Sequence, residues 1–208
     1  MKARVLLASS DLTVPLGVAC LRTGGLVVFP TDTVYGVGAH GFMPEAVERL
    51  YSAKIRPRRK AVPLLLAEAQ DLELIAQDIP EVAWKLIRRF WPGGLTLVLR
   101  ARESVPTVVR AGGHTVAARV PDHPLTQELI RTLGAPVAAT SANLSGRRSP
   151  RTAQEAMEEL GDRVDLYIDG GECPGGIEST VMDVTGRMPV VLRHGAIPEG
   201  KLRETIAF

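Results

Sequence analysis

One segment organises the chain: Gly24-Gly-Leu-Val-Val-Phe-Pro-Thr-Asp-Thr-Val-Tyr-Gly-Val-Gly38. Residues 26–29 form a short apolar run without a polar break, which predicts a strand buried on both faces. Pro30 cannot donate to a strand ladder, so we expect regular pairing to weaken there. The small polar side chains at 31–33 then follow a strand end, where α/β proteins commonly bind ligands. An ordinary strand followed by a turn is the alternative interpretation.

The glycines of this segment also need an interpretation. Gly36, Gly38 and Gly41 spell G-x-G-x-x-G, which in dinucleotide-binding folds is followed about 20 residues later by an acidic residue. Here the downstream region 54–60 is basic, so that fold is excluded, and no G-x-x-x-x-G-K-[ST] motif is present. We expect Gly36 and Gly38 to permit a close approach to the backbone or a positive φ.

Length and composition narrow the class of protein. The chain has 208 residues, of which 45% are hydrophobic, so it can form one sizeable domain with a true core. Its net charge is only +2, so attraction for phosphate or nucleic acid must come from local clustering. Cys20 and Cys173 belong to no C-x-x-C motif, and the four histidines show no H-x-x-x-H spacing, which argues against a metal site made of side chains.

The location of the protein is also an expectation from sequence. No signal-like N-terminus and no long apolar span is present, so we expect a cytoplasmic protein without membrane association. In that compartment the two cysteines are expected to be reduced.

Hydrophobic periodicity alternates between helices and strands along the chain. Helices are predicted at 11–22, 44–53, 78–90, 124–133 and 153–160. Strands are predicted at 26–29, 62–66, 95–99, 115–120, 136–139, 164–168, 180–184 and 190–192. A turn at 185–187 predicts a hairpin between the last two strands, so the sheet cannot be all parallel. The prediction is one α/β domain over 1–208, with a mixed parallel and antiparallel sheet and flanking helices.

A basic run follows the second predicted helix. It contains Lys54, Arg56, Arg58, Arg59 and Lys60. Because the chain around the intervening proline should be extended, residues 54, 56 and 58 are expected to point to one side. Such converging cations suit a triphosphate or a nucleic-acid backbone, and a solvated charged loop is the alternative.

Small polar residues follow the strand predicted at 136–139. The sequence Thr140-Ser-Ala-Asn-Leu-Ser-Gly146 offers hydroxyls, an amide and a glycine, which suit a polar ligand cradle or a plain turn. Ser149 lies just before a capping box, Thr152-x-x-Glu155, near a helix N-terminus that favours anions. Ser141 is outside any G-x-S-x-G motif, so a hydrolase nucleophile is not expected.

Two further pairs lie on predicted strands or at their ends. Thr115 and Arg119 are four residues apart on one strand and therefore face the same side. Arg119 stands among apolar residues and needs a planar anion, either a ligand or an internal Asp or Glu. Glu178-Ser179-Thr180 precedes a strand and Arg193 ends one.

Together these segments resemble the YrdC/Sua5 family of threonylcarbamoyl-AMP synthases. The resemblance rests on Pro30-Thr-Asp-Thr-Val-Tyr-Gly36, Lys54-x-Arg56, Thr140–Gly146, Glu178-Ser-Thr-Val181 and Leu192-Arg-His-Gly-Ala-Ile197, and it runs from about residue 12 to 200. It is to the short form, without the additional C-terminal domain of longer members. The fold it implies is a twisted mixed sheet with a large concave, basic cavity.

The resemblance implies a nucleotidyltransferase activity. Such an enzyme forms threonylcarbamoyl-AMP and pyrophosphate from L-threonine, bicarbonate or CO2 and ATP, for t6A37 modification of tRNA. Mg²⁺ is expected through the ATP phosphates rather than through protein ligands. The implied partner is the threonylcarbamoyl-transferase complex that receives the product, and direct contact with tRNA is a further option.

The resemblance also assigns residues. Thr33, Arg119 and Ser179 would hold threonine or its carbamate, and Lys54 and Arg56 would be catalytic. The residues that would bind ATP are Lys54, Arg56, Arg58, Thr115, Ser141, Asn143, Ser149 and Arg193. The segment after Arg56 is more basic than is usual in the family, which leaves the roles of Arg58 and Arg59 open.

Two questions stay open at the level of sequence. No residue is a convincing base for the threonine amine, and Asp32 is only a candidate. The alternative function is a structured-RNA-binding module that uses the basic cavity without catalysis. Aromatic residues are only 4% of the chain, which disfavours base stacking of that kind.

Overall fold

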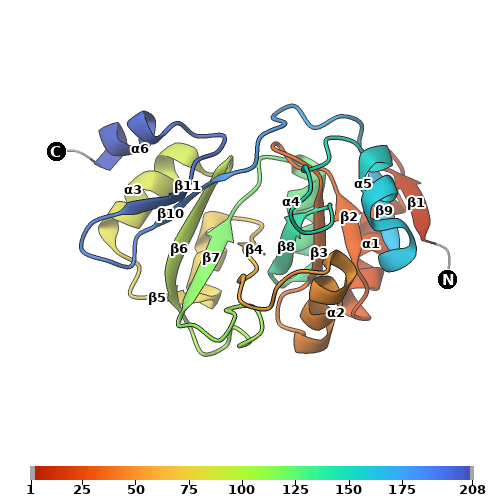
Figure 1. Ribbon diagram of the computed structural model, residues 1–208, viewed down its shortest axis with the longest axis horizontal. Coiled ribbons are helices and arrows are strands. Elements are labelled where there is room, and N and C mark those ends of the chain that lie inside the picture. The colour runs from red at the N-terminus through yellow and green to blue at the C-terminus, as the bar shows by residue number, and fades with distance from the viewer. Residues whose placement is uncertain (1–2, 207–208) are drawn as a thin grey trace.

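The computed structural model describes residues 3–206, and one mixed β-sheet runs through it from β1 at one end to β11 at the other (Figure 1). Within these residues the sheet has eleven strands: β1 (Arg4–Leu7), β2 (Val27–Phe29), β3 (Gly36–His40), β4 (Leu64–Leu65), β5 (Ala76–Gln77), β6 (Leu95–Ala101), β7 (Thr115–Arg119), β8 (Val137–Ser141), β9 (Leu166–Asp169), β10 (Thr180–Asp183) and β11 (Val190–Arg193).

The strand order is β1-β9-β2-β3-β8-β4-β7-β6-β10-β11, with β5 paired to β6. The pairs β1/β9, β2/β9, β4/β7 and β6/β10 are parallel. The other pairs are antiparallel, including the predicted hairpin of β10 and β11. The predicted mixed α/β architecture is confirmed.

Helices pack on both faces of this sheet. They are α1 (Thr13–Arg22), α2 (Pro44–Lys54), α3 (Glu81–Phe90), α4 (Pro124–Leu133), α5 (Ala153–Leu160) and α6 (Glu199–Ile206). On β2, Val27 and Phe29 belong to the cluster formed with α1 and α4, whereas Val28 belongs to the larger cluster that includes α2, α3 and α5. The apolar run of β2 is therefore buried on both faces, as predicted.

The glycines of β3 serve packing within the sheet. A Cβ built on Gly38 would overlap Val137 Cγ1 and would lie 2.9 Å from Phe29 Cε1, and one built on Gly36 would lie 3.0 Å from Phe29 Cε2. The absence of side chains at Gly36 and Gly38 therefore leaves room for the Phe29 ring beside β3. The close approach expected at Gly36 and Gly38 is confirmed, with the Phe29 ring as the neighbour, whereas neither glycine has a positive φ. Strand β3 itself was not predicted, because glycine is a poor predictor of strands.

Several boundaries differ from the predictions. The helix expected from Asp11 begins at Thr13, and the helix expected from Asp78 begins at Glu81, because Asp78 has a left-handed φ of 51°. The strand expected at 62–66 is reduced to β4. Strand β1, strand β5 and helix α6 were not predicted.

Candidate active site

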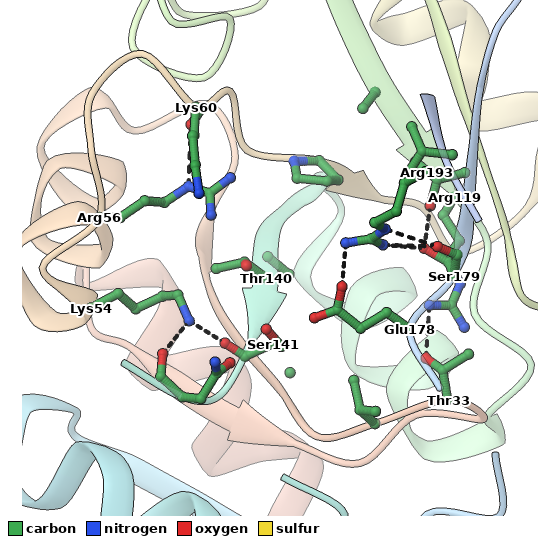
Figure 2. Close-up of a pocket in the computed structure, with 18 of the residues that line it drawn as sticks. Thr33, Lys54, Arg56, Lys60, Arg119, Thr140, Ser141, Glu178, Ser179 and Arg193 are labelled. Carbon is green, nitrogen blue, oxygen red and sulfur yellow. Dashed lines mark hydrogen bonds and ion pairs between the residues drawn. The ribbon is translucent and has the colours of Figure 1, made fainter. Parts of the chain in front are cut away.

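A cavity of about 460 Å³ lies over the middle of the sheet, within the size range of small-molecule sites. Segments far apart in sequence line it, as Figure 2 shows for the labelled side chains. The residues that line it are Thr31, Thr33, Val34, Gly36, Lys54, Arg56, Lys60, Ala61, Pro63, Leu65, Thr96, Ala117, Arg119, Ala139, Thr140, Ser141, Asn143, Ser145, Gly146, Arg147, Glu178, Ser179, Val181 and Arg193.

The charge of the cavity is strongly asymmetric. Six of the described lining residues are cationic: Lys54, Arg56, Lys60, Arg119, Arg147 and Arg193. Glu178 is the one carboxylate among them. A chain of nearly balanced composition therefore concentrates positive charge in one hollow, which favours an anionic ligand.

Lys54 is the last residue of α2, and its side chain is only 1% exposed. Its ammonium donates short hydrogen bonds to the carbonyls of Ser141 and Asn143, and its own carbonyl accepts from Ser145 N at 3.0 Å. Burial, with the charge of nearby Arg56 adding to it, lowers the pKa of Lys54 to about 7. Lys54 thus fixes the loop after β8 to α2 and brings a titratable amine to the cavity wall.

The rest of the basic run does not follow the predicted alternation. Arg56 lines the cavity and donates to the carbonyls of Lys60 (3.1 Å) and Ala61 (2.7 Å), and Lys60 lines the cavity as well. Arg58 instead pairs with Glu48 on the outside of α2. The expectation that 54, 56 and 58 share one side was wrong, because Lys54 is helical and Ile55 turns the chain with a left-handed φ of 52°.

Arg119 is buried at the end of β7 and is held on three sides. It donates to Gly93 O at 2.8 Å, to Thr33 Oγ1 at 2.9 Å and to Asp32 Oδ1 at 2.5 Å. The same Asp32 oxygen also accepts from the Asp122 amide at 3.0 Å, so the carboxylate is held in place and orients Arg119. The internal carboxylate considered for Arg119 is therefore present. Three of its five N–H groups are engaged, which leaves two for a ligand anion.

A second polar cluster lies beside Arg119, on the neighbouring strands β6 and β11 and on the residues just before β10. Ser179 Oγ is 2.7 Å from Thr96 Oγ1. Arg193 donates to Ser179 O at 2.8 and 3.1 Å and forms an ion pair with Glu178. Ser149 Oγ donates to the other oxygen of Glu178 at 2.6 Å. Burial opposes the charge of Glu178, but Ser149 and Arg193 outweigh it and hold the pKa of the carboxyl below its usual value.

The loop after β8 presents an acceptor that lacks a partner. Asn143 is buried and donates through its amide nitrogen to Leu144 O (3.0 Å) and Arg147 O (2.6 Å). Its Oδ1 has no hydrogen-bond partner among the described residues. This oxygen is therefore an unsatisfied buried acceptor behind the cavity wall.

The structure brings most of the predicted site residues together. Those that line the cavity are Thr33, Lys54, Arg56, Arg119, Ser141, Asn143, Ser179 and Arg193. Ser149 is not itself among the lining residues, but its hydroxyl donates to the lining residue Glu178. Arg58 and Thr115 are not among the lining residues. Thr115 shares the side of Arg119, as predicted, but four residues of strand place it about 13 Å further along β7.

The residues assigned from the sequence leave out seven polar or charged residues of the described cavity lining: Thr31, Lys60, Thr96, Thr140, Ser145, Arg147 and Glu178. Lys60 and Thr140 lie inside segments that the sequence had singled out. Only the fold shows which members of those segments face the cavity.

The described residues offer no metal site of their own. No three His, Cys, Asp or Glu side chains within residues 3–206 gather closely enough to hold an ion. None of the helices in this part of the chain combines the length and apolar character needed to cross a membrane.

Comparison with known proteins identifies the family. A family model named Sua5_yciO_yrdC and described as "Telomere recombination" matches residues 19–195. The chain belongs to the Sua5/YciO/YrdC family. The threonylcarbamoyl-AMP synthases of Pyrococcus abyssi and Bacillus subtilis are 45% and 41% identical to it, over 89% and 96% of this chain.

A solved structure agrees with this family membership. Pyrococcus abyssi Sua5 complexed with L-threonine superimposes with a TM-score of 0.95 at 40% identity, over all of this chain. The chain spans 55% and 58% of the two synthases and 61% of the Sua5 chain. The comparison therefore covers only the matched part of each relative, which is between half and two thirds of its length.

Proposed function

We propose that this protein is an L-threonylcarbamoyladenylate synthase, a nucleotidyltransferase that forms threonylcarbamoyl-AMP and pyrophosphate from L-threonine, bicarbonate or CO2 and ATP. The observation that carries the proposal is one cavity with two chemically different ends. Thr33, Arg119 and Ser179 form one end, and Lys54 with the loop after β8 forms the other, as Figure 2 shows. Relatives named as synthases, and one solved with L-threonine, support it.

The end with Arg119 suits an amino acid. Its two remaining N–H groups can bind a carboxylate, and the hydroxyls of Thr33 and Ser179 can accept from or donate to the hydroxyl and nitrogen of threonine. Asp32 holds Arg119 in place, so the guanidinium need not reorganise when the substrate binds.

The other end suits a nucleotide. Lys54, Arg56 and Lys60 line it and can hold phosphates. We propose that Mg²⁺ arrives on the ATP phosphates, since no cluster of side chains within residues 3–206 could hold it. Lys54, Arg56 and Lys60 would lie beside the phosphates that carry the ion, which would supply further positive charge there.

The reaction needs placement more than proton transfer. The carboxylate of the threonine carbamate is already a nucleophile, and it attacks the α-phosphate in line while pyrophosphate leaves. The cavity cations stabilise the charge on the leaving group. The product would be passed to a threonylcarbamoyl-transferase for t6A37 modification of tRNA. The matched relatives do not favour the RNA-binding alternative.

A substrate-omission assay tests the proposal. Pyrophosphate release and an AMP-level product should require ATP, L-threonine and bicarbonate together. Arg119→Ala should abolish turnover, while Arg203→Ala on α6, which pairs with Glu199 outside the cavity, should leave it unchanged. Turnover that is indifferent to threonine would refute the assignment.

A further inference from the structure

Glu178 is a carboxylate inside a cavity built for anions. It lies between strands β9 and β10 and reaches into the cavity toward Arg193 (Figure 2). One of its oxygens accepts from Ser149 Oγ at 2.6 Å, and the other forms an ion pair with Arg193 Nη1. These donors come from the loop before α5 and from β11, so Glu178 joins two sides of the cavity.

Ser149 and Arg193, the two donors, are also expected to bind the nucleotide. Ser149 and Arg193 are both residues that the family resemblance assigns to ATP. Both donate to the carboxylate of Glu178, whose oxygens resemble phosphate oxygens as hydrogen-bond acceptors. While Ser149 and Arg193 donate to Glu178, the same hydrogens are not available to a phosphate. The negative charge of Glu178 would also repel a polyphosphate bound beside it.

We propose that Glu178 is an internal anion that competes with the phosphates of the nucleotide for Ser149 and Arg193, and that these phosphates displace it when the nucleotide binds. The inference rests on the proposed function. It makes Glu178 a determinant of polyphosphate affinity: the carboxylate weakens binding of ATP and pyrophosphate, and its return to Ser149 and Arg193 assists release of pyrophosphate.

Arg193 does not depend on Glu178 for its position. Its Nε and Nη2 donate to Ser179 O at 3.1 and 2.8 Å, and Nη2 lies 3.2 Å from Ser179 Oγ. Removing the charge of Glu178 therefore weakens its hold on Nη1 of Arg193 without releasing the guanidinium, because a neutral amide oxygen is a poorer acceptor than a carboxylate. A direct role for Glu178 in binding a substrate donor, such as a ribose hydroxyl, predicts the opposite effect on affinity.

The test is isothermal titration of Glu178→Gln with Mg²⁺-pyrophosphate and with Mg²⁺-ATP. Because the pair is partly exposed, we expect both ligands to bind about 3- to 10-fold more tightly than to the wild type. The affinity for L-threonine should stay within about twofold, since its proposed partners keep their contacts. Glu172→Gln is the matched control, because Glu172 lies on the same connecting segment and pairs with Arg151 away from the cavity lining.

The outcomes separate the two proposals. Unchanged or weaker pyrophosphate binding by Glu178→Gln, with normal binding by the wild type, overturns the inference and leaves the synthase assignment intact. Absence of ATP and pyrophosphate binding by the wild type overturns both. A crystal structure with pyrophosphate gives a second readout that no folding defect affects: Ser149 and Arg193 should contact phosphate oxygens. If both still hold Glu178, the inference is wrong.

Discussion

The buried amine of Lys54 predicts an unusual pH dependence of stability. Both hydrogen-bond partners of this ammonium are neutral carbonyls, and burial lowers its pKa from 10.5 to about 7. In the unfolded chain Lys54 keeps its proton up to about pH 10.5, whereas the folded protein loses it near pH 7. Between these values the unfolded state binds more protons, so the free energy of unfolding should rise with pH.

The size of the effect follows from the two pKa values. The free energy of unfolding rises by at most about 1.4 kcal/mol per pH unit, and it reaches this slope at pH values well above the pKa of Lys54 in the folded protein. From pH 7 to pH 9 the gain should be about 2 kcal/mol, because half of the folded protein is still protonated at the start. Burial raises the pKa of Cys20 and Cys173 to about 11, which acts with the opposite sign as the pH approaches and passes 9. The wild type must therefore be compared with a variant that replaces Lys54 and keeps both cysteines, so that the contribution of the thiols cancels.

The assay is urea unfolding at pH 7, 8 and 9, followed by the fluorescence of Trp84 and Trp91. At each pH the unfolding free energy of Lys54→Met is subtracted from that of the wild type. This difference should rise by about 2 kcal/mol from pH 7 to pH 9. The control is Lys201→Met on α6, since Lys201 is exposed and its removal should leave the slope unchanged. If Lys54→Met does not fold, the ¹³Cε resonance of Lys54 in the wild type reports the same titration. Identical slopes, or a Lys54 resonance that titrates near 10.5, would refute the reasoning.

Three shorter predictions follow from the packing and the cavity. Arg119→Lys should raise the KM for L-threonine about tenfold or more in steady-state assays, because an ammonium cannot replace the planar guanidinium fork; an unchanged KM would contradict this. Gly38→Ala should lower the urea-unfolding free energy by about 1–3 kcal/mol, because the added methyl would overlap Val137, and a neutral effect would show that β3 can shift. Lys60→Met should raise the KM for ATP about tenfold, whereas Thr115→Val should not change it, and equal effects would disprove the assigned cavity lining.

Local chemistry accounts for the parts of the fold that were predicted. The apolar run at 26–29, the capping box at Thr152 and the turn at 185–187 each act within a few residues, so their elements form where expected. Thr152 Oγ1 accepts from Glu155 N at 3.1 Å, as the capping box requires. The family resemblance named eight of the residues that line the cavity, because it rests on short motifs at strand ends.

Contacts between distant segments decided the rest. Arg58 and Thr115 belong to the right segments but lie outside the cavity, because a helix end turns the chain at residue 55 and because β7 carries Thr115 away from the centre. The partnership of Glu178 with Ser149 and Arg193 spans 29 and 15 residues.

The sequence by itself determined the alternation of helices and strands, the buried β2 and the family, since all three depend on the types of residues within short segments. Only the tertiary structure decided which cations converge, that Asp32 orients Arg119, and that Lys54 is held by neutral carbonyls. The physical reason is that burial and electrostatic environment depend on neighbours in space, and the sheet order places those neighbours far apart along the chain.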